Sequence, residues 1–192
     1  MARIKGFALR GLLKSVKESG GSIPAVLAAL PEAERALFAR PIVTSEWYPY
    51  AAFAALVRAI DGIQGKGDIV HARALGRAAA VRDLGTTFRI ISAVASPKFL
   101  IERGHMFWSK YCDAGTLRLD ASGERFFKAR LEGFPEIDQA HCVLIEGWLE
   151  GLGDALGAIG MASRHVRCVH RGDADCEFEG SWKADRPGRW LG

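Results

Sequence analysis

Apolar residues recur every three to four positions through the first half of the chain, which is the spacing of one buried helix face. The first such segment carries Ile4, Phe7 and Val16 on one side and ends at a Gly-Gly pair. The pattern predicts helices over residues 4–20, 23–30, 32–38, 47–60, 68–81, 86–94 and 97–111. The N-terminal half is therefore expected to be helical.

The second half switches to alternation of apolar and polar positions, which is typical of strands. Segments 115–120 and 125–132 predict one hairpin, and segments 163–170 and 174–182 predict another. Between them, an apolar stripe predicts a long helix that Asp138 caps and that runs to Leu156. The expected fold class is α+β, with N-terminal helices packed on an antiparallel sheet made of two hairpins separated by this helix.

Two glycines, Gly147 and Gly151, lie four residues apart on the long helix. Glycine costs about 1 kcal/mol in a helix interior, so a pair of them indicates close packing against another element. We expect this face to press against the sheet.

Length and composition indicate one ordinary globular domain of 192 residues, with 49% hydrophobic residues. We expect a single ligand-binding domain over 1–192, with an N-terminal helical part at 1–67 and a core at about 68–182. The net charge of +4 comes from scattered basic residues, so nucleic acid is not indicated as a partner. No apolar stretch approaches the roughly 20 residues that span a bilayer, and no signal peptide is recognised, so a cytoplasmic location is expected.

Three cysteines and a histidine near the C-terminus, Cys142, His165, Cys168 and Cys176, form the pattern C-x22-H-x2-C-x7-C. Thiolate and imidazole are the ligands that Zn2+ prefers, and four of them leave no open position for chemistry. The expected cofactor is a structural zinc ion. If Gly172 centres the last hairpin, Cys168 faces Cys176, whereas His165 needs a bulge or the frayed start of the strand to reach the same face. Buried free thiols and a disulfide are the alternatives.

The segment from Cys142 through Gly147 and Gly151 to Cys176 resembles the C-terminal half of the 4-vinyl-reductase domain, over about residues 136–182. That family includes sensor domains of phenol- and toluene-responsive activators, in which three cysteines and a glutamate hold a structural zinc. The resemblance implies that Cys142, Cys168 and Cys176 are metal ligands, with His165 at the glutamate position. It also implies binding of a hydrophobic or aromatic small molecule.

Aromatic residues gather before the first hairpin, where Phe99, Trp108 and Tyr111 accompany His105. An aromatic pocket with one imidazole suits a small apolar molecule with one polar group. The family resemblance also implies ligand contacts from a histidine and a tryptophan in this region. The alternative is that these aromatic residues belong to the core.

No phosphate loop, catalytic triad or dinucleotide motif is present, so the sequence favours binding over catalysis. We expect a sensor that acts through a partner protein or a homodimer. One alternative is an accessory protein or reductase in tetrapyrrole metabolism of the bacteriochlorophyll type. The other is a dimerising scaffold without ligand.

Overall fold

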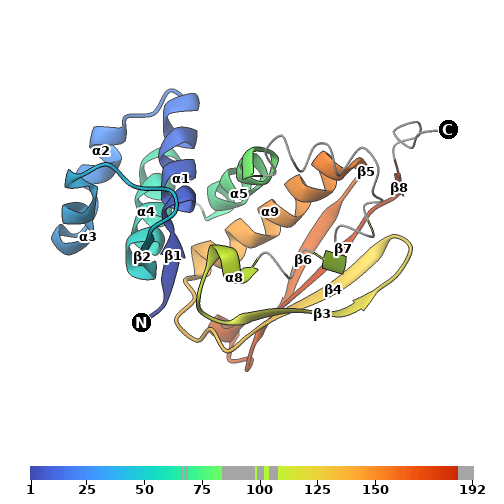
Figure 1. Ribbon diagram of the computed structural model, residues 1–192. Coiled ribbons are helices and arrows are strands. Elements are labelled where there is room, and N and C mark those ends of the chain that lie inside the picture. Colours follow the sequence, from blue (N-terminus) through green and yellow to red (C-terminus); the bar gives the residue numbers. More distant parts are fainter. Residues whose placement is uncertain (66, 68, 84–97, 99–101, 104–107, 186–192) are drawn as a thin grey trace.

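The computed structural model describes residues 1–65, 67, 69–83, 98, 102–103 and 108–185. A helical layer comes first along the chain, followed by a sheet covered by helices on one face (Figure 1). This arrangement confirms the α+β fold class. No helix among the described residues is long and apolar enough to cross a membrane.

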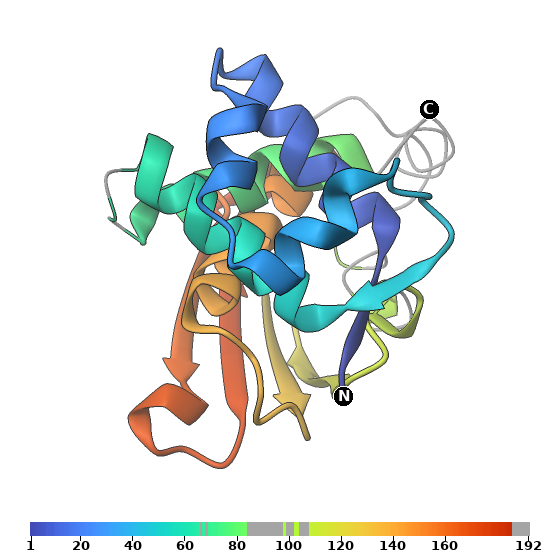
Figure 2. The same ribbon diagram turned by 90° about the vertical axis from the view of Figure 1, so that its left-hand side faces the viewer.

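The N-terminal layer contains α1 (Gly6–Glu18), α2 (Ile23–Ala28), α3 (Glu32–Ala36), a short 3-10 turn (Leu37–Ala39) and α4 (Tyr50–Gln64). Figure 2 shows this layer stacked over one end of the sheet. A two-stranded ribbon of β1 (Arg3–Lys5) and β2 (Trp47–Pro49) joins α1 to α4. The prediction that both segments are helical was wrong. The residue before a proline is biased towards extended backbone, so Tyr48 continues a strand and the helix starts after Pro49.

The main sheet has the strand order β3-β4-β7-β6, and its strands are antiparallel. They are β3 (Thr116–Ser122), β4 (Phe126–Glu132), β6 (Ala162–Arg167) and β7 (Cys176–Ser181), which are the two predicted hairpins. A second ribbon pairs β5 (Ala158–Ile159) with β8 (Ala184–Asp185). A short 3-10 turn (Val169–Arg171) lies in the loop between β6 and β7, and the short helix α8 (Trp108–Tyr111) precedes β3.

The two faces of the sheet differ in chemistry. Phe127, Leu131 and Phe178 lie buried on the face towards the helices. On the other face, Lys128 forms ion pairs with Glu177 and Glu179 across the β4–β7 ladder. Alternation along each strand therefore separates an apolar core from a charged outer surface.

Helix α9 (Gln139–Leu156) crosses the sheet, and α5 (Val70–Asp83) lies along α9 (Figure 1). The Asp138 side chain accepts a hydrogen bond from the Ala140 amide at the start of α9. Gly157 ends the helix with φ 87°, in the left-handed region where glycine is favoured. The predicted boundaries of this helix are confirmed.

Gly147 and Gly151 face α5, so the expectation that they face the sheet was wrong. A Cβ atom added at Gly147 would lie 1.8 Å from the carbonyl oxygen of Arg73, and one at Gly151 would lie 2.3 Å from that of Arg77. On the opposing helix, a Cβ atom at Gly76 would lie 1.9 Å from the carbonyl oxygen of Leu144. The two backbones are therefore in direct contact, which only residues without a side chain allow.

One arginine, Arg73, links α5 and α9 to the sheet. Arg73 forms ion pairs with Glu146 at 3.0 Å and Glu150 at 2.5 Å, and it donates a hydrogen bond to the carbonyl of Ser163 at the start of β6. The Glu150 carboxylate also accepts a hydrogen bond from the Ser163 amide. Arg73 thus links α5, α9 and β6.

Candidate functional site

The four predicted metal ligands meet at the N-terminal end of α9. Their candidate ligand atoms all lie within 4.8 Å of one another, on Cys142, His165, Cys168 and Cys176. The Sγ atoms of Cys142 and Cys176 are 3.8 Å apart. All three cysteines are buried, and none of them forms a disulfide. The spacing in the sequence therefore identified four residues that the fold brings together, and metal binding by them stays a prediction.

Three of these residues lie on β6, on β7 and in the loop between them. The pairing of β6 with β7 shifts register between His165 and Arg167, which is the predicted irregularity that lets His165 reach the cluster. Cys168 lies beyond the paired strand, where its amide donates to the Asp173 carboxylate. Cys168 keeps extended backbone, with φ −149° and ψ 130°, and follows Arg167, which pairs with Glu177. Continuing that register places Cys168 opposite Cys176, as predicted, and their sulfur atoms lie within 4.8 Å of each other.

Hydrogen bonding and burial shift the pKa values of the three thiols in different directions. A hydrogen bond from the Cys142 thiol, aided by His165 and opposed by burial, lowers the pKa of Cys176 to about 4. The same hydrogen bond, together with burial, raises the pKa of Cys142 far above its ordinary value. Burial also raises the pKa of Cys168. The cluster therefore favours a single thiolate, on Cys176, stabilised by its neighbours.

A second group lies one residue earlier on α9, where His141 is 1% exposed. Its ring centre lies 4.8 Å from that of Phe53, 5.5 Å from Tyr50, 6.2 Å from Trp108 and 6.4 Å from Tyr111. These rings come from α4 and α8. We call this group of five rings the aromatic cluster.

The two ring nitrogens of His141 differ in their hydrogen bonding. Its Nδ1 lies 3.0 Å from the hydroxyl of Tyr50, which also accepts a hydrogen bond from the Asp138 amide at 2.8 Å. Its Nε2 is buried and has no hydrogen-bond partner among the described residues. Burial lowers the pKa of His141 to about 3, so the ring is neutral near pH 7.

The hydrogen-bond arrangement selects one tautomer. If Nδ1 carried the proton, both the Tyr50 hydroxyl hydrogen and the Nε2 lone pair would lack a partner. If the hydroxyl donates to Nδ1, the proton sits on Nε2 and one buried donor lacks an acceptor. The second arrangement leaves fewer buried polar groups unpaired and is therefore favoured. His141 thus presents an N–H group inside an aromatic enclosure.

Two of the four predicted ligand-binding residues, Trp108 and Tyr111, belong to the aromatic cluster. Phe99 and His105 lie outside the described residues. The sequence analysis did not assign His141 to a ligand site. The available signal was its place on the apolar stripe of α9, four residues before Ile145, where an imidazole needs a partner.

No protein-family model matches the chain, and no curated protein is similar to it. Solved structures of H-NOX proteins share its fold over nearly the whole length. One is a triple mutant from S. oneidensis in the Fe(II) state, with a TM-score of 0.72, 15% identity, and coverage of 96% of this chain and 98% of that one. Another is the unliganded Fe(II) protein from K. algicida, with a TM-score of 0.66, 10% identity, and coverage of 95% and 98%.

This comparison corrects two expectations. The similar structures are those of H-NOX proteins, so the resemblance to the 4-vinyl-reductase domain was wrong. They are described in Fe(II), Fe(II)NO and Fe(II)CO ligation states, so the expectation of a structural zinc ion was wrong. Both errors share a cause, because the matching motif covered only residues 136–182 and a hairpin–helix–hairpin order suits both families.

Three features of the described residues do not suit a haem. Hollows of about 420 Å³ between α2 and α4 and about 270 Å³ near the N-terminus are lined by no histidine, cysteine or tyrosine. The helix-facing side chains of β4 are apolar, being Phe127, Ala129 and Leu131, so they offer no partner for propionates. The direct backbone contact of α5 with α9 leaves no room for a porphyrin between them.

Proposed function

We propose that this chain is a small-molecule sensor domain whose ligand, a small aromatic or otherwise hydrophobic molecule with one polar atom, binds directly at the aromatic cluster. The observation that carries the proposal is the buried N–H of His141, which has no described partner. The whole-length similarity in fold to H-NOX domains supports a sensing role.

The chemistry of the cluster suits such a ligand. Aromatic rings offer apolar contact, and a single buried N–H offers one directional hydrogen bond to an oxygen of the ligand. That bond removes the cost of an unpaired buried donor, about 1–3 kcal/mol, which adds to the affinity of a correct ligand. A ligand without an acceptor atom gains nothing from His141.

The position of the cluster also suits signalling. Its rings come from α4, α8 and α9, so a bound molecule alters how these helices pack. Occupancy then shifts the population of two arrangements of the domain, which a protein partner or a second copy reads. The predicted homodimer and partner belong to this proposal.

We further propose that Cys142, His165, Cys168 and Cys176 bind one thiophilic transition-metal ion. Support comes from the convergence of four donor atoms within 4.8 Å and from the preference of soft metals for sulfur. Titration with Co2+ tests this, because thiolate coordination gives an intense charge-transfer absorption. A Cys142→Ser/Cys176→Ser variant should lose that band, and a Cys112→Ser variant should keep it.

The ligand proposal is tested with phenol as the probe, by calorimetry on the full chain. His141→Phe keeps the ring volume and removes both nitrogen atoms. We expect the affinity for phenol to fall at least about tenfold, which is about 1.4 kcal/mol, with a smaller loss of melting temperature than in Tyr50→Phe. His71→Phe, on α5, serves as the matched control. Equal affinity in the unmodified chain and in His141→Phe would exclude His141 as the polar anchor.

Titration with hemin decides between direct binding and haem-mediated binding. We expect no stoichiometric complex with the Soret band of an imidazole-ligated haem. A one-to-one complex that His105→Ala abolishes would replace direct binding with a haem-mediated mechanism, with the predicted ligand residue His105 as the axial ligand.

A further inference from the structure

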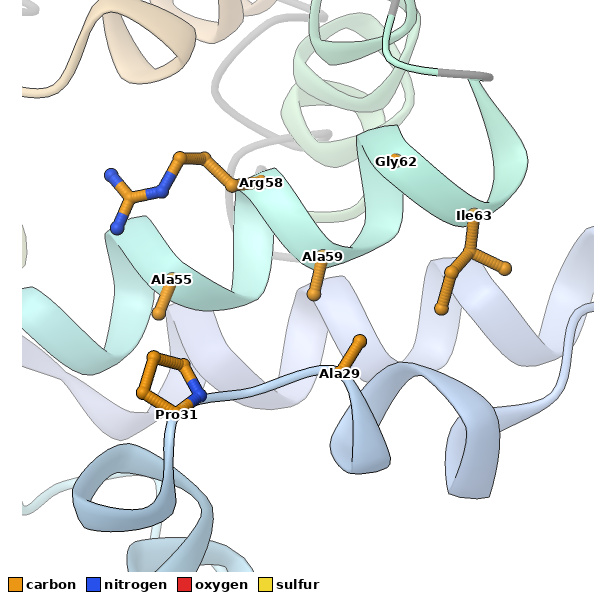
Figure 3. A pocket seen from close by; sticks show the side chains of 7 residues that line it. All are labelled: Ala29, Pro31, Ala55, Arg58, Ala59, Gly62 and Ile63. Atoms are coloured by element: carbon orange, nitrogen blue, oxygen red, sulfur yellow. The ribbon is translucent and has the colours of Figure 1, made fainter.

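The hollow between α2 and α4 has walls of small apolar side chains (Figure 3). Ala29 and Pro31 form one wall, from the end of α2 and the turn before α3. Ala55, Ala59 and Ile63 form the other, along one side of α4. The volume of about 420 Å³ falls in the range of small-ligand pockets. Ile63 is 43% exposed, so this wall leaves apolar surface in water.

One cation, Arg58, borders this hollow. Its Nη1 forms a hydrogen-bonded ion pair with the Asp138 carboxylate. A guanidinium has five N–H donors, and those on Nε and Nη2 of Arg58 have no partner recorded among the described residues. The side chain is 57% exposed. Arg58 can therefore hold a second carboxylate without giving up the first.

We propose that this hollow is a second ligand site, which takes a short apolar carboxylic acid in its ionised form. The hydrocarbon part covers Ile63 and the alanine wall. The carboxylate accepts hydrogen bonds from the free edge of Arg58. Charge-assisted hydrogen bonds of this kind are roughly twice as strong as neutral ones, so charge and apolar contact both contribute to selectivity.

The site has a physical connection to the aromatic cluster. Arg58 binds the carboxylate of Asp138, and the amide of Asp138 donates to the hydroxyl of Tyr50. That hydroxyl contacts Nδ1 of His141 at 3.0 Å. An acid on Arg58 competes for its charge with Asp138 and so alters the hydrogen bond at Tyr50. Occupancy of the hollow is therefore expected to change the environment of His141.

Calorimetry with hexanoate on the full chain tests the site. We expect saturable binding of hexanoate, and at least about tenfold weaker binding of acetate, which lacks the apolar body, and of hexan-1-ol, which lacks the charge. Absence of saturable hexanoate binding overturns the proposal. Equal affinity for hexan-1-ol overturns the assignment of an acid.

Two variants locate the bound hexanoate. Ala59→Trp fills the hollow and should abolish binding, whereas Ala51→Trp, at an exposed position of the same helix, should not. Arg58→Gln should weaken binding about tenfold, whereas Arg10→Gln on α1 should not. Because Arg58 is on the surface, its variant is expected to fold even if Ala59→Trp does not. Unchanged affinity in Arg58→Gln, or in a folded Ala59→Trp, places the acid elsewhere and overturns the site.

A second measurement tests the connection. Hexanoate should shift the imidazole NMR signals of His141 in the unmodified chain and leave them unmoved in Arg58→Gln. Binding of hexanoate without any change at His141 would disprove the connection. Neither experiment uses phenol, so their failure is distinguishable from failure of the proposed function.

Discussion

The middle and the N-terminal end of α9 are buried by opposite means. In the middle, Gly147 and Gly151 bring the helix backbone against that of α5. At its N-terminal end, His141 and Cys142 bring an imidazole and a thiol into the interior, and Nε2 of His141 has no described partner. The first region is specified by shape and the second by chemistry.

This difference indicates where function lies. Close-packed backbone tolerates almost no change in volume, and it gives a ligand nothing to recognise. Buried polar groups with incomplete partners cost stability, so their persistence calls for an explanation. The comparison predicts that substitutions in the middle of α9 damage folding, whereas substitutions at its start mainly damage binding.

The largest effect should follow from Gly147→Ala. Its new methyl group would collide with the Arg73 carbonyl oxygen at 1.8 Å, so the helices must separate. We expect a loss of about 3 kcal/mol in the free energy of unfolding, measured with urea. The control is Gly62→Ala on α4, where the space around the glycine is open, and a gain of up to about 1 kcal/mol is expected. Equal behaviour of the two variants would refute the close packing.

Arg73→Met should have the next largest effect, because it leaves the buried carboxylate of Glu150 without its cation. We expect a loss of about 2 kcal/mol at pH 7, below the cost for a fully buried pair because Arg73 is 37% exposed. Denaturation with urea measures it.

The loss in Arg73→Met should depend on pH. Burial works to raise the pKa of Glu150, but hydrogen bonds from Arg73 and the Ser163 amide outweigh it and lower that pKa below 4.5. A depressed folded pKa stabilises the protein above the unfolded value and ceases to do so as pH falls through the folded value. The gap between the two proteins should therefore shrink below about pH 4.5. Burial raises the pKa of Glu146 and the charge of Arg73 works against that rise, so loss of this second ion pair changes the gap in the same direction. A gap that widens in acid would contradict the assignment.

Tyr50→Phe should cost about 1–2 kcal/mol, because both the Asp138 amide and Nδ1 of His141 lose their partner. His141→Phe removes a buried donor that has no described acceptor, but it also leaves the Tyr50 hydroxyl hydrogen without its acceptor, so the two effects offset each other and a smaller loss than in Tyr50→Phe is expected. The double variant should recover part of the loss in Tyr50→Phe, which thermal unfolding of all four proteins measures. Strict additivity would show that the two side chains are not coupled.

The smallest effect is expected for Asp138→Ala, which removes the N-cap of α9. A loss of about 1 kcal/mol is typical of such caps. Circular dichroism during urea unfolding measures it, with Glu136→Ala, an exposed carboxylate in the preceding turn, as the control. A loss as small as that in the control would show that Asp138 does not cap the helix.

Much of the fold was accessible from the sequence because its signals are local. Alternation identified the hairpins, and Asp138 with the apolar stripe identified α9. The spacing of Cys142, His165, Cys168 and Cys176 identified a cluster that the structure brings together. The hairpin and helix signals depend on residues close along the chain, whereas the cysteine–histidine spacing reaches from α9 to β7.

The remaining features depend on contacts between distant segments. Nothing near Gly147 reveals that its partner is Arg73 of α5 and not the sheet. The strand at Trp47 exists because Arg3–Lys5 pairs with it across the domain. His141 acquires its role only when α4 and α8 place aromatic rings around it. Such pairings arise from the tertiary fold, which sequence patterns do not specify.

The state of the His141 ring tests the account most directly, and long-range imidazole NMR on the unmodified chain reports it. The account predicts a neutral ring protonated on Nε2, unchanged between about pH 5 and pH 8, because burial lowers its pKa to about 3. It also predicts that saturating phenol shifts the Nε2 signal. A ring that titrates near pH 6.5, or an Nε2 signal that phenol leaves unmoved, would contradict the account.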